Sequence, residues 1–276
     1  MNMATIFAES QQLPHIPRVV QELIESFRDE DIDADVISEK VAMDQSLTAK
    51  VLRLANSAHY GVSRTIANPH DAVMLLGFNT LRTMVLASGV TGAFKAPEGF
   101  DQNKFWRNAF SVAALSKWIA PYVNGCDKDT AFTCGMLHSI GELLIRMVMP
   151  EEAASIDAAA DMSNSKRHTL ENGQLGFTAA DVGAELAKRW KFPEDMQQAI
   201  ASQNGPDLEK EYSQYAGIIY IARYLKQAHD ENWPESQIVE QFPVAVAHHI
   251  GMDVDKAHTD LADANGVSSG LDGLLE

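Results

Sequence analysis

Apolar residues recur at steps of three and four along nearly every segment of this 276-residue chain, and this spacing is typical of helices that bury one face. No stretch alternates between apolar and polar residues for long enough to indicate a strand. The clearest apolar stripe lies between residues 45 and 58 and consists of Leu47, Val51, Leu54 and Ala58. Asp44 can cap this helix, and Gly61 follows its end. The pattern therefore predicts an all-α fold.

The same pattern predicts most of the other helices. The segment 70–94 reads as two helices that meet near Gly77, the second of which faces inward through Phe78, Leu81, Val85 and Leu86. Later helices are expected at about 103–120, 128–148, 150–163, 178–190, 194–203, 208–228 and 235–250, with ends uncertain by ~2–4 residues.

One segment combines Pro, Gly and polar residues between two helical regions, which indicates a lobe boundary or hinge: "KAPEGFDQN", residues 95–103. We therefore expect a two-lobed architecture, with an N-terminal helical lobe at 1–98 and a second helical lobe at 99–262. Residues 263–276 are rich in Gly and Ser, so they are expected to form a flexible tail.

The charge of the chain limits its partners. Its formal net charge is −16, from 38 acidic and 22 basic residues, and such a field repels nucleic-acid phosphates and anionic membrane surfaces. Neither is an expected partner.

The N-terminus has no signal-peptide pattern, and the longest apolar runs are far shorter than the ~20 residues of a membrane span. The expected location is cytoplasmic, where Cys126 and Cys134 should be reduced thiols.

A series of fragments resembles one known family. In chain order they are "LPHIPRVVQELIE", "DQSLTAKVLRLANSAHYG", "HDAVMLLGFNTLRTMVLA", "FWRNAFSVAALSKWIA", "AFTCGMLHSIGELLI", "LGFTAADVGAELAKRWKFPEDMQQAIASQ" and "YAGIIYIARYL". Together they span roughly residues 13 to 228 and resemble the HD-related output domain (HDOD) family. The resemblance implies a helical N-terminal lobe and a second lobe descended from HD-type metal-dependent phosphohydrolases.

The resemblance also implies where an active relative would hold a metal ion. Such an enzyme needs an early His, an adjacent His-Asp pair, often further His residues and a late Asp, because these side chains hold a divalent cation that activates water. At those positions this chain has Asn108, the pair His138-Ser139, Ala179, Gln203, Asn204 and Arg223. Only His138 keeps a metal-binding side chain.

Glu142 stands where metal-dependent relatives often carry a Lys. A carboxylate there would repel an anionic substrate, by ~1 kcal/mol at 4 Å in water and by more when partly buried. We therefore expect a vestigial cleft without catalytic residues, metal or cofactor. An uncharged pocket lined by Asn108, Ser139, Gln203 and Asn204 could still accept a small polar ligand.

His138 has two further interpretations. A Ser-His dyad with Ser139 is unfavourable because residues i and i+1 of a helix do not face each other. Cys134, His138 and Glu142 would share one face of a regular helix, but three residues over about 12 Å are too far apart for one ion. Two of them with a distant partner remain an alternative. The simplest interpretation is that the imidazole bonds a neighbouring carbonyl or carboxylate.

Other polar residues have simple structural interpretations. Asn56 is expected either to make a contact at the lobe interface or with a partner, or to close a helix C-terminus, and its capping preference favours the second role. Asp253 can cap a last helix. His248, His249 and His258 are expected at the surface or at helix ends, and Trp106, Trp118 and Trp190 in the core.

Three functions fit these observations. The favoured one is a non-catalytic signal-transduction module that binds a protein partner, with a small ligand in the vestigial cleft as an option. The alternative is a metal-dependent phosphohydrolase or phosphodiesterase acting on a nucleotide. The third is a DNA-binding helix-turn-helix in the first lobe, but Arg82 would be its single recognition cation beside Asn79 and Thr80.

Overall fold

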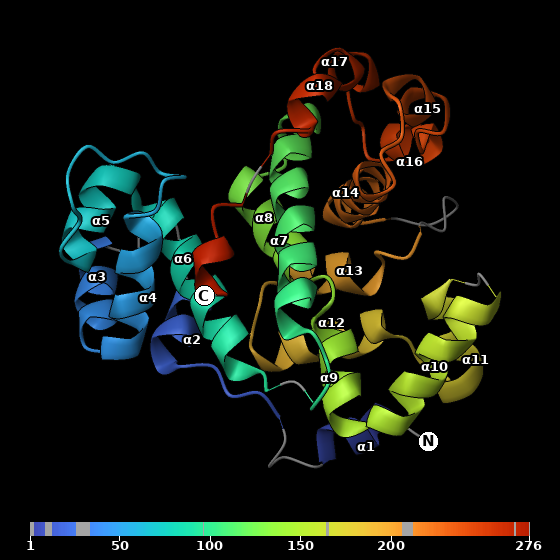
Figure 1. Cartoon of the computed structure of the whole chain (residues 1–276), viewed down its shortest axis with the longest axis horizontal. Coiled ribbons are helices and arrows are strands. Elements are labelled where there is room, and N and C mark those ends of the chain that lie inside the picture. Colours follow the sequence, from blue (N-terminus) through green and yellow to red (C-terminus); the bar gives the residue numbers. More distant parts are fainter. Residues whose placement is uncertain are drawn as a thin grey trace. The chain divides into compact units, whose positions relative to one another are not determined.

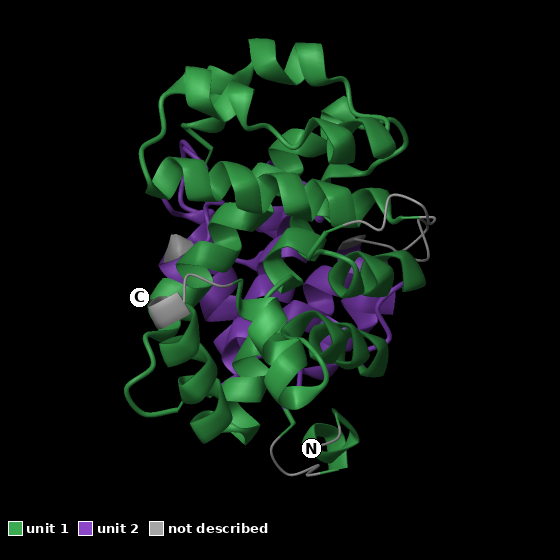
Figure 2. Cartoon of the chain, turned by 90° about the vertical axis from the view of Figure 1, so that its right-hand side faces the viewer, with its two compact units in different colours: residues 1–13, 95–189, 194–267 green, residues 14–94, 190–193, 268–276 purple. Residues whose placement is uncertain are grey.

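The structure is a computed structural model that describes residues 3–8, 13–25, 34–95, 97–163, 166–205, 212–267 and 269–275. The described residues form helices and turns, and their single β-bridge joins Val123 and Met252. The predicted all-α fold is confirmed. The chain divides into two compact units, which Figure 2 colours separately. Unit 1 comprises residues 1–13, 95–189 and 194–267, and unit 2 comprises 14–94, 190–193 and 268–276.

Unit 2 is a small helical bundle (Figure 1). Its core contains fully buried side chains such as Leu23, Leu54 and Leu81. Its elements are α2 (Arg18–Glu25), α3 (Ala34–Ala42), α4 (Gln45–Ala55), α5 (Pro69–Leu76), α6 (Phe78–Ala93) and the short 3-10 helix η2 (Asp272–Leu274).

The predicted signals at the ends of these helices are confirmed. The Asp44 carboxylate accepts a hydrogen bond from the Leu47 backbone N–H at 3.0 Å and caps α4. Gly77 separates α5 from α6 with a φ of 83°, a conformation that glycine adopts without the steric cost of a Cβ. Asn56 closes α4 by donating to the Leu52 carbonyl at 2.7 Å, and it also exchanges two hydrogen bonds with the backbone of Ile66.

Unit 1 is larger, and its long helices α7 and α14 pack against each other and against α8 (Figure 1). Its elements are α1 (Met3–Ala8), α7 (Gln102–Ile119), η1 (Ala120–Tyr122), α8 (Lys128–Leu137), α9 (Ile140–Val148), α10 (Pro150–Ser163), α11 (Arg167–Leu175), α12 (Ala179–Arg189), α13 (Glu194–Ala201), α14 (Gln214–Asp230), α15 (Glu235–Glu240), α16 (Val244–His249), α17 (Val254–Thr259) and α18 (Leu261–Ala264).

Two glycines bring α9 and α12 into close contact. A Cβ on Gly141 would overlap the Ala179 carbonyl oxygen and the Gly183 backbone nitrogen. Backbone atoms cannot move aside as a flexible side chain can, so the helix crossing depends on the missing side chain. This crossing places the start of α12 beside the start of α9.

Two predicted helices are each divided in the structure. The segment predicted as 128–148 is α8 and α9, separated at His138 and Ser139. The segment predicted as 235–250 is α15 and α16, separated at Phe242 and Pro243, because proline lacks the N–H that a continuing helix requires. The pattern did not predict α11 or α18, whereas the last helix expected after Asp253 is α17. Part of the predicted 208–228 helix lies outside the described residues.

The stretch Lys128–Val148 is long and apolar enough to cross a membrane by composition alone. In the structure it is mostly buried and interrupted, which is consistent with core helices of a soluble protein.

The predictions for Asp253 and for the tryptophans are confirmed in part. Asp253 caps α17 through the Lys256 N–H, and Trp106 and Trp190 are buried, whereas Trp118 is half-buried.

The predicted lobe limits, the hinge at 95–103 and the flexibility of 263–276 stay predictions. The helix α18 (Leu261–Ala264) extends into the first two residues of the last segment, and Leu271, which belongs to unit 2, is fully buried.

Candidate functional site

The break between α8 and α9 turns His138 and Ser139 toward a cavity in unit 1. The His138 carbonyl accepts a hydrogen bond from the Gln203 side-chain amide at 2.6 Å. The Glu142 N–H, which would bond the His138 carbonyl in a continuous helix, donates to the Ser139 carbonyl at 3.0 Å. The backbone groups at the break are thus satisfied without a continuous helix. Cys134, His138 and Glu142 therefore do not share one regular helical face, and Cys134 is fully buried while the other two line the cavity.

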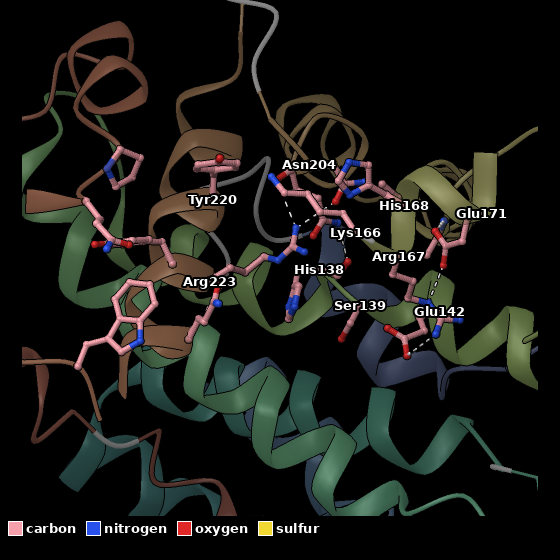
Figure 3. A pocket seen from close by; sticks show the side chains of 18 residues that line it. His138, Ser139, Glu142, Lys166, Arg167, His168, Glu171, Asn204, Tyr220 and Arg223 are labelled. Atoms are coloured by element: carbon pink, nitrogen blue, oxygen red, sulfur yellow. Dashed lines mark hydrogen bonds and ion pairs between the residues drawn. The ribbon is translucent and has the colours of Figure 1, made fainter. Parts of the chain in front are cut away.

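The cavity has a volume of about 530 Å³ and is lined entirely by residues of unit 1 (Figure 3). It contains seven of the eight residues predicted for the cleft: His138, Ser139, Glu142, Ala179, Gln203, Asn204 and Arg223. Asn108 is exposed on α7 and lines a neighbouring cavity of about 320 Å³, which shares four of these residues. The chain fold thus gathers the residues named from the sequence, while their descent from metal ligands stays a prediction.

His138 is held as a neutral imidazole. Its Nδ1 lies 2.6 Å from the Gly135 carbonyl oxygen, and because a carbonyl only accepts, Nδ1 carries the proton in this bond. Burial, followed by the nearby Arg223 cation, lowers the pKa of His138 from 6.5 to about 3. Its Nε2 has no partner among the described residues. The bond to a carbonyl is the simple interpretation made from the sequence.

Arg223 extends from α14 into the cavity beside His138, and Figure 3 shows its guanidinium directed toward Asn204. Nη1 donates to Asn204 Oδ1 at 3.0 Å and to the Gln203 carbonyl at 3.4 Å. Burial lowers the pKa of Arg223, although Glu142 and Glu171 act to raise it, and a guanidinium stays charged in such surroundings. No carboxylate of the described residues lies within ion-pair distance of it.

The two glutamates of the cavity are already paired with arginines. Glu142 lies 2.7 Å from Arg146 Nη2, and Glu171 lies 2.8 Å from Arg167 Nε. Asp157 joins the two arginines, since it pairs with both Arg146 and Arg167. The repulsion of anions that the sequence predicts for Glu142 is therefore offset by its partner.

Glu171 also fixes the start of α12. It is 1% exposed, and its second oxygen accepts the Ala179 N–H at 2.8 Å. Burial raises the pKa of this carboxyl in spite of the Ala179 and Arg167 bonds. Ala179 therefore contributes its backbone to the wall of the cavity, and its methyl group offers no ligand atom.

Sequence reasoning missed the α11 side and the aromatic side of the cavity. The α11 side supplies Lys166, Arg167, His168 and Glu171, and the aromatic side supplies Tyr220, Tyr224 and Trp233. Two ion pairs at i,i+4 spacing, Glu142–Arg146 and Arg167–Glu171, were the available sequence signals, but such pairs are common on exposed helices as well.

The donor set does not fit the metal ion that an active HD enzyme would hold. Around His138 the chain offers a hydroxyl, a methyl group, two amides and a guanidinium. Within the described part of the chain, no group of three or more His, Cys, Asp or Glu side chains is placed to hold a metal. A fixed cation beside the imidazole opposes a second cation by Coulomb repulsion.

The two cysteines and the three histidines near the C-terminus lie outside the cavity. Both cysteines are free, and burial raises the pKa of the Cys126 thiol to about 11 and that of Cys134 well above its ordinary value. Neither is a reactive thiolate at neutral pH. His248 and His249 are exposed at the end of α16, and the ring of His258 packs edge-on against Phe242.

The chain is similar to a known protein family and to several known proteins. The family model of the HDOD domain matches residues 13–206. The chain therefore belongs to the HDOD family. A solved structure with similar sequence and fold is that of a putative phosphohydrolase from Shewanella amazonensis SB2B, with 36% identity, a TM-score of 0.82, and coverage of 99% of this chain and 98% of that one.

Two other proteins resemble this chain at lower sequence identity. A putative signal transduction protein from Marinobacter aquaeolei VT8 is 21% identical, with a TM-score of 0.80 over 98% of this chain and 61% of that one, which shows a common fold. An uncharacterized protein from Treponema pallidum (strain Nichols) is 23% identical over 85% of this chain. The HDOD chain spans 46% of the length of that curated relative.

Proposed function

We propose that this HDOD protein is a non-catalytic regulatory module that binds a protein partner in the cytoplasm. Membership of the HDOD family and the fold shared with a signal transduction protein fit a regulatory role. The observation that carries the non-catalytic part is Arg223, a guanidinium without a carboxylate partner in the described structure, which lies beside the single histidine that remains from the expected ligand set. Such an arrangement disfavours a bound metal ion.

A surface on unit 2 supports the partner-binding part. Four large apolar side chains are exposed on or at the end of α3 and α5: Val36 at 43%, Met43 at 82%, Met74 at 70% and Leu75 at 44%. The two helices are neighbours, since His70 of α5 lies 3.3 Å from Asp35 of α3. Exposed apolar patches often mark protein interfaces, and methionine adapts its shape to different partners.

Affinity capture from native cytosol tests this proposal. The purified chain should retain a specific protein, and the double variant Met43→Lys, Met74→Lys should lose it. Val239→Lys is a matched control, because Val239 is a 39% exposed apolar residue of unit 1. Retention of the same protein by the double variant, or equal loss in the control, would contradict the assignment of this surface.

The expected absence of nucleic-acid and membrane partners belongs to the same proposal. Its support is the net charge of −16, which opposes binding to polyanions. A gel shift at low salt and flotation with anionic vesicles should both show no binding.

The second candidate function is a metal-dependent phosphohydrolase, which the 36% identity to a putative phosphohydrolase favours. Elemental analysis of protein purified without chelator distinguishes the two functions. Stoichiometric Fe, Mn or Zn, together with phosphodiester turnover that is lost on chelation, would favour the enzyme over the regulatory module.

A further inference from the structure

The cavity of unit 1 holds more positive than negative charge that is available to a ligand. Its two carboxylates, Glu142 and Glu171, are paired with Arg146 and Arg167, and these two arginines also share the carboxylate of Asp157, which does not line the cavity. By contrast, Nε and Nη2 of Arg223 and Nζ of Lys166 have no partner among the described residues. Arg167 Nη2 is buried and also lacks a hydrogen-bond partner.

These cations face a common space. Arg223, Lys166 and Arg167 all line the same cavity, and Figure 3 shows Lys166 and Arg223 around one part of it, together with Asn204 and His168. Burial lowers the pKa of both His138 and His168 most, and the charge of Arg223 is the next largest cause for each. Lys166 lowers the pKa of His168 further. Two separate imidazoles therefore experience the positive potential.

A buried cation without a counter-ion is costly, and an oxyanion relieves that cost. A guanidinium offers parallel N–H groups that match the two oxygens of a carboxylate or phosphate. Since Nη1 of Arg223 is used by Asn204 and Gln203, Nε and Nη2 remain for such a ligand.

We propose that this cavity binds the phosphate or carboxylate group of a small anionic molecule, with Arg223 as its principal contact and Lys166 as a supporting donor. The anionic group occupies the region where a cation would sit in a metal-dependent relative, so the charge preference of the cleft is reversed. The ligand is larger than the anion itself, because the cavity of about 530 Å³ extends to Tyr220, Tyr224 and Trp233. Planar or apolar groups pack well on such aromatic side chains.

This inference goes beyond the proposed function and does not depend on it. It concerns a cavity of unit 1, whereas the proposed partner surface lies on unit 2. The variant Met43→Lys, Met74→Lys should bind anions as the wild-type chain does, so the two proposals can fail separately.

Calorimetric titration of the purified full chain tests the proposal, with inorganic phosphate and citrate as separate probes against a chloride reference of equal ionic strength. Phosphate or citrate should bind at one site per chain, and the stronger probe identifies the preferred oxyanion. Arg223→Gln should weaken binding by about tenfold or more, since a hydrogen bond to a charged group contributes roughly that factor or more. Lys166→Gln, at an exposed residue, should weaken it less.

Arg107→Gln is the matched control, because Arg107 is exposed on α7 and lines neither cavity. Its binding should equal that of the wild-type chain. The imidazole NMR signals of His138 should shift as phosphate or citrate is added, and this locates the site. The proposal is overturned if neither probe binds, if Arg223→Gln binds as tightly as the wild type, or if the control loses binding equally.

Discussion

The side-chain amide of Gln203 donates a hydrogen bond to the backbone carbonyl of His138 across 65 residues of sequence, at 2.6 Å. The same amide also donates to the Ile200 carbonyl at 3.0 Å, and Gln203 is 3% exposed. One buried side chain thus holds the interruption between α8 and α9 that shapes the cavity.

Gln203→Met should therefore destabilise the protein. The substitution keeps the length of the side chain but leaves the part-buried His138 carbonyl without its partner, which costs about 1–3 kcal/mol. Urea denaturation measures the change. Gln198→Met, at an exposed position of α13, is the control and should stay within about 0.5 kcal/mol of the wild type. Equal stability of the two variants would show that the amide does not support the break.

His138 should make stability depend on pH. Because burial lowers its pKa to about 3 from 6.5, the unfolded state binds a proton before the folded state as the pH falls. Stability from this group is complete above about pH 6.5 and is lost toward pH 3, by at most ~1.4 kcal/mol per pH unit. Urea denaturation at pH 7.5 and pH 5 should show the loss.

The variant His138→Asn isolates that effect, because its amide can keep the bond to the Gly135 carbonyl and does not titrate in this range. It should lose part of the pH dependence seen in the wild type. His59→Asn, at an exposed position of unit 2, should retain it. An unchanged slope in His138→Asn would place the titration in another group.

Gly141→Ala should be strongly destabilising, because the added Cβ would overlap backbone atoms of Ala179 and Gly183. We expect a loss of roughly 1–3 kcal/mol or more from this overpacking. Gly173→Ala is an informative control, since a Cβ there meets nothing within 4 Å inside α11. It should stabilise the protein by about 0.5–1 kcal/mol. Thermal unfolding of both variants measures the two opposite shifts.

Asn56→Ala should destabilise unit 2 by about 1–3 kcal/mol, since it removes the contacts of one amide with Leu52 and Ile66 and leaves the Ile66 N–H unsatisfied. Hydrogen exchange of the Ile66 amide should accelerate. Asn79→Ala, exposed on α6, should leave both quantities unchanged. Slow exchange at Ile66 in the Asn56 variant would contradict this interpretation.

The parts of the fold that depend on local chemistry were predictable from the sequence. The cap at Asp44 and the turn at Gly77 follow from residue types whose preferences act within one helical turn. The break at His138 was not predictable, because its carbonyl is satisfied by Gln203, a residue distant in sequence. Amphipathic periodicity reports which face of a helix is buried and carries no information on such a bond.

The candidate site was also predictable only in part. The residues Ser139, Ala179 and Arg223 were named from the HDOD resemblance, and the fold brings them to one cavity. The α11 side was missed because that helix buries only Glu171 and Leu175 and so lacks an apolar stripe. Its place in the structure is set by ion pairs, which short-range sequence patterns do not reveal.

The ion pairs of Arg167 determine how one wall of the cavity responds to pH. Arg167 joins α11 to Asp157 of α10 by an ion pair, and the buried residues of α11 are Glu171 and Leu175. Partly buried ion pairs resist screening by salt but lose their attraction once a carboxylate is protonated. Burial acts to raise the pKa of Asp157, but its hydrogen bonds and charge attraction with Arg146 and Arg167 lower it below 3.8 overall. This wall of the cavity should therefore stay attached until the solution is strongly acidic.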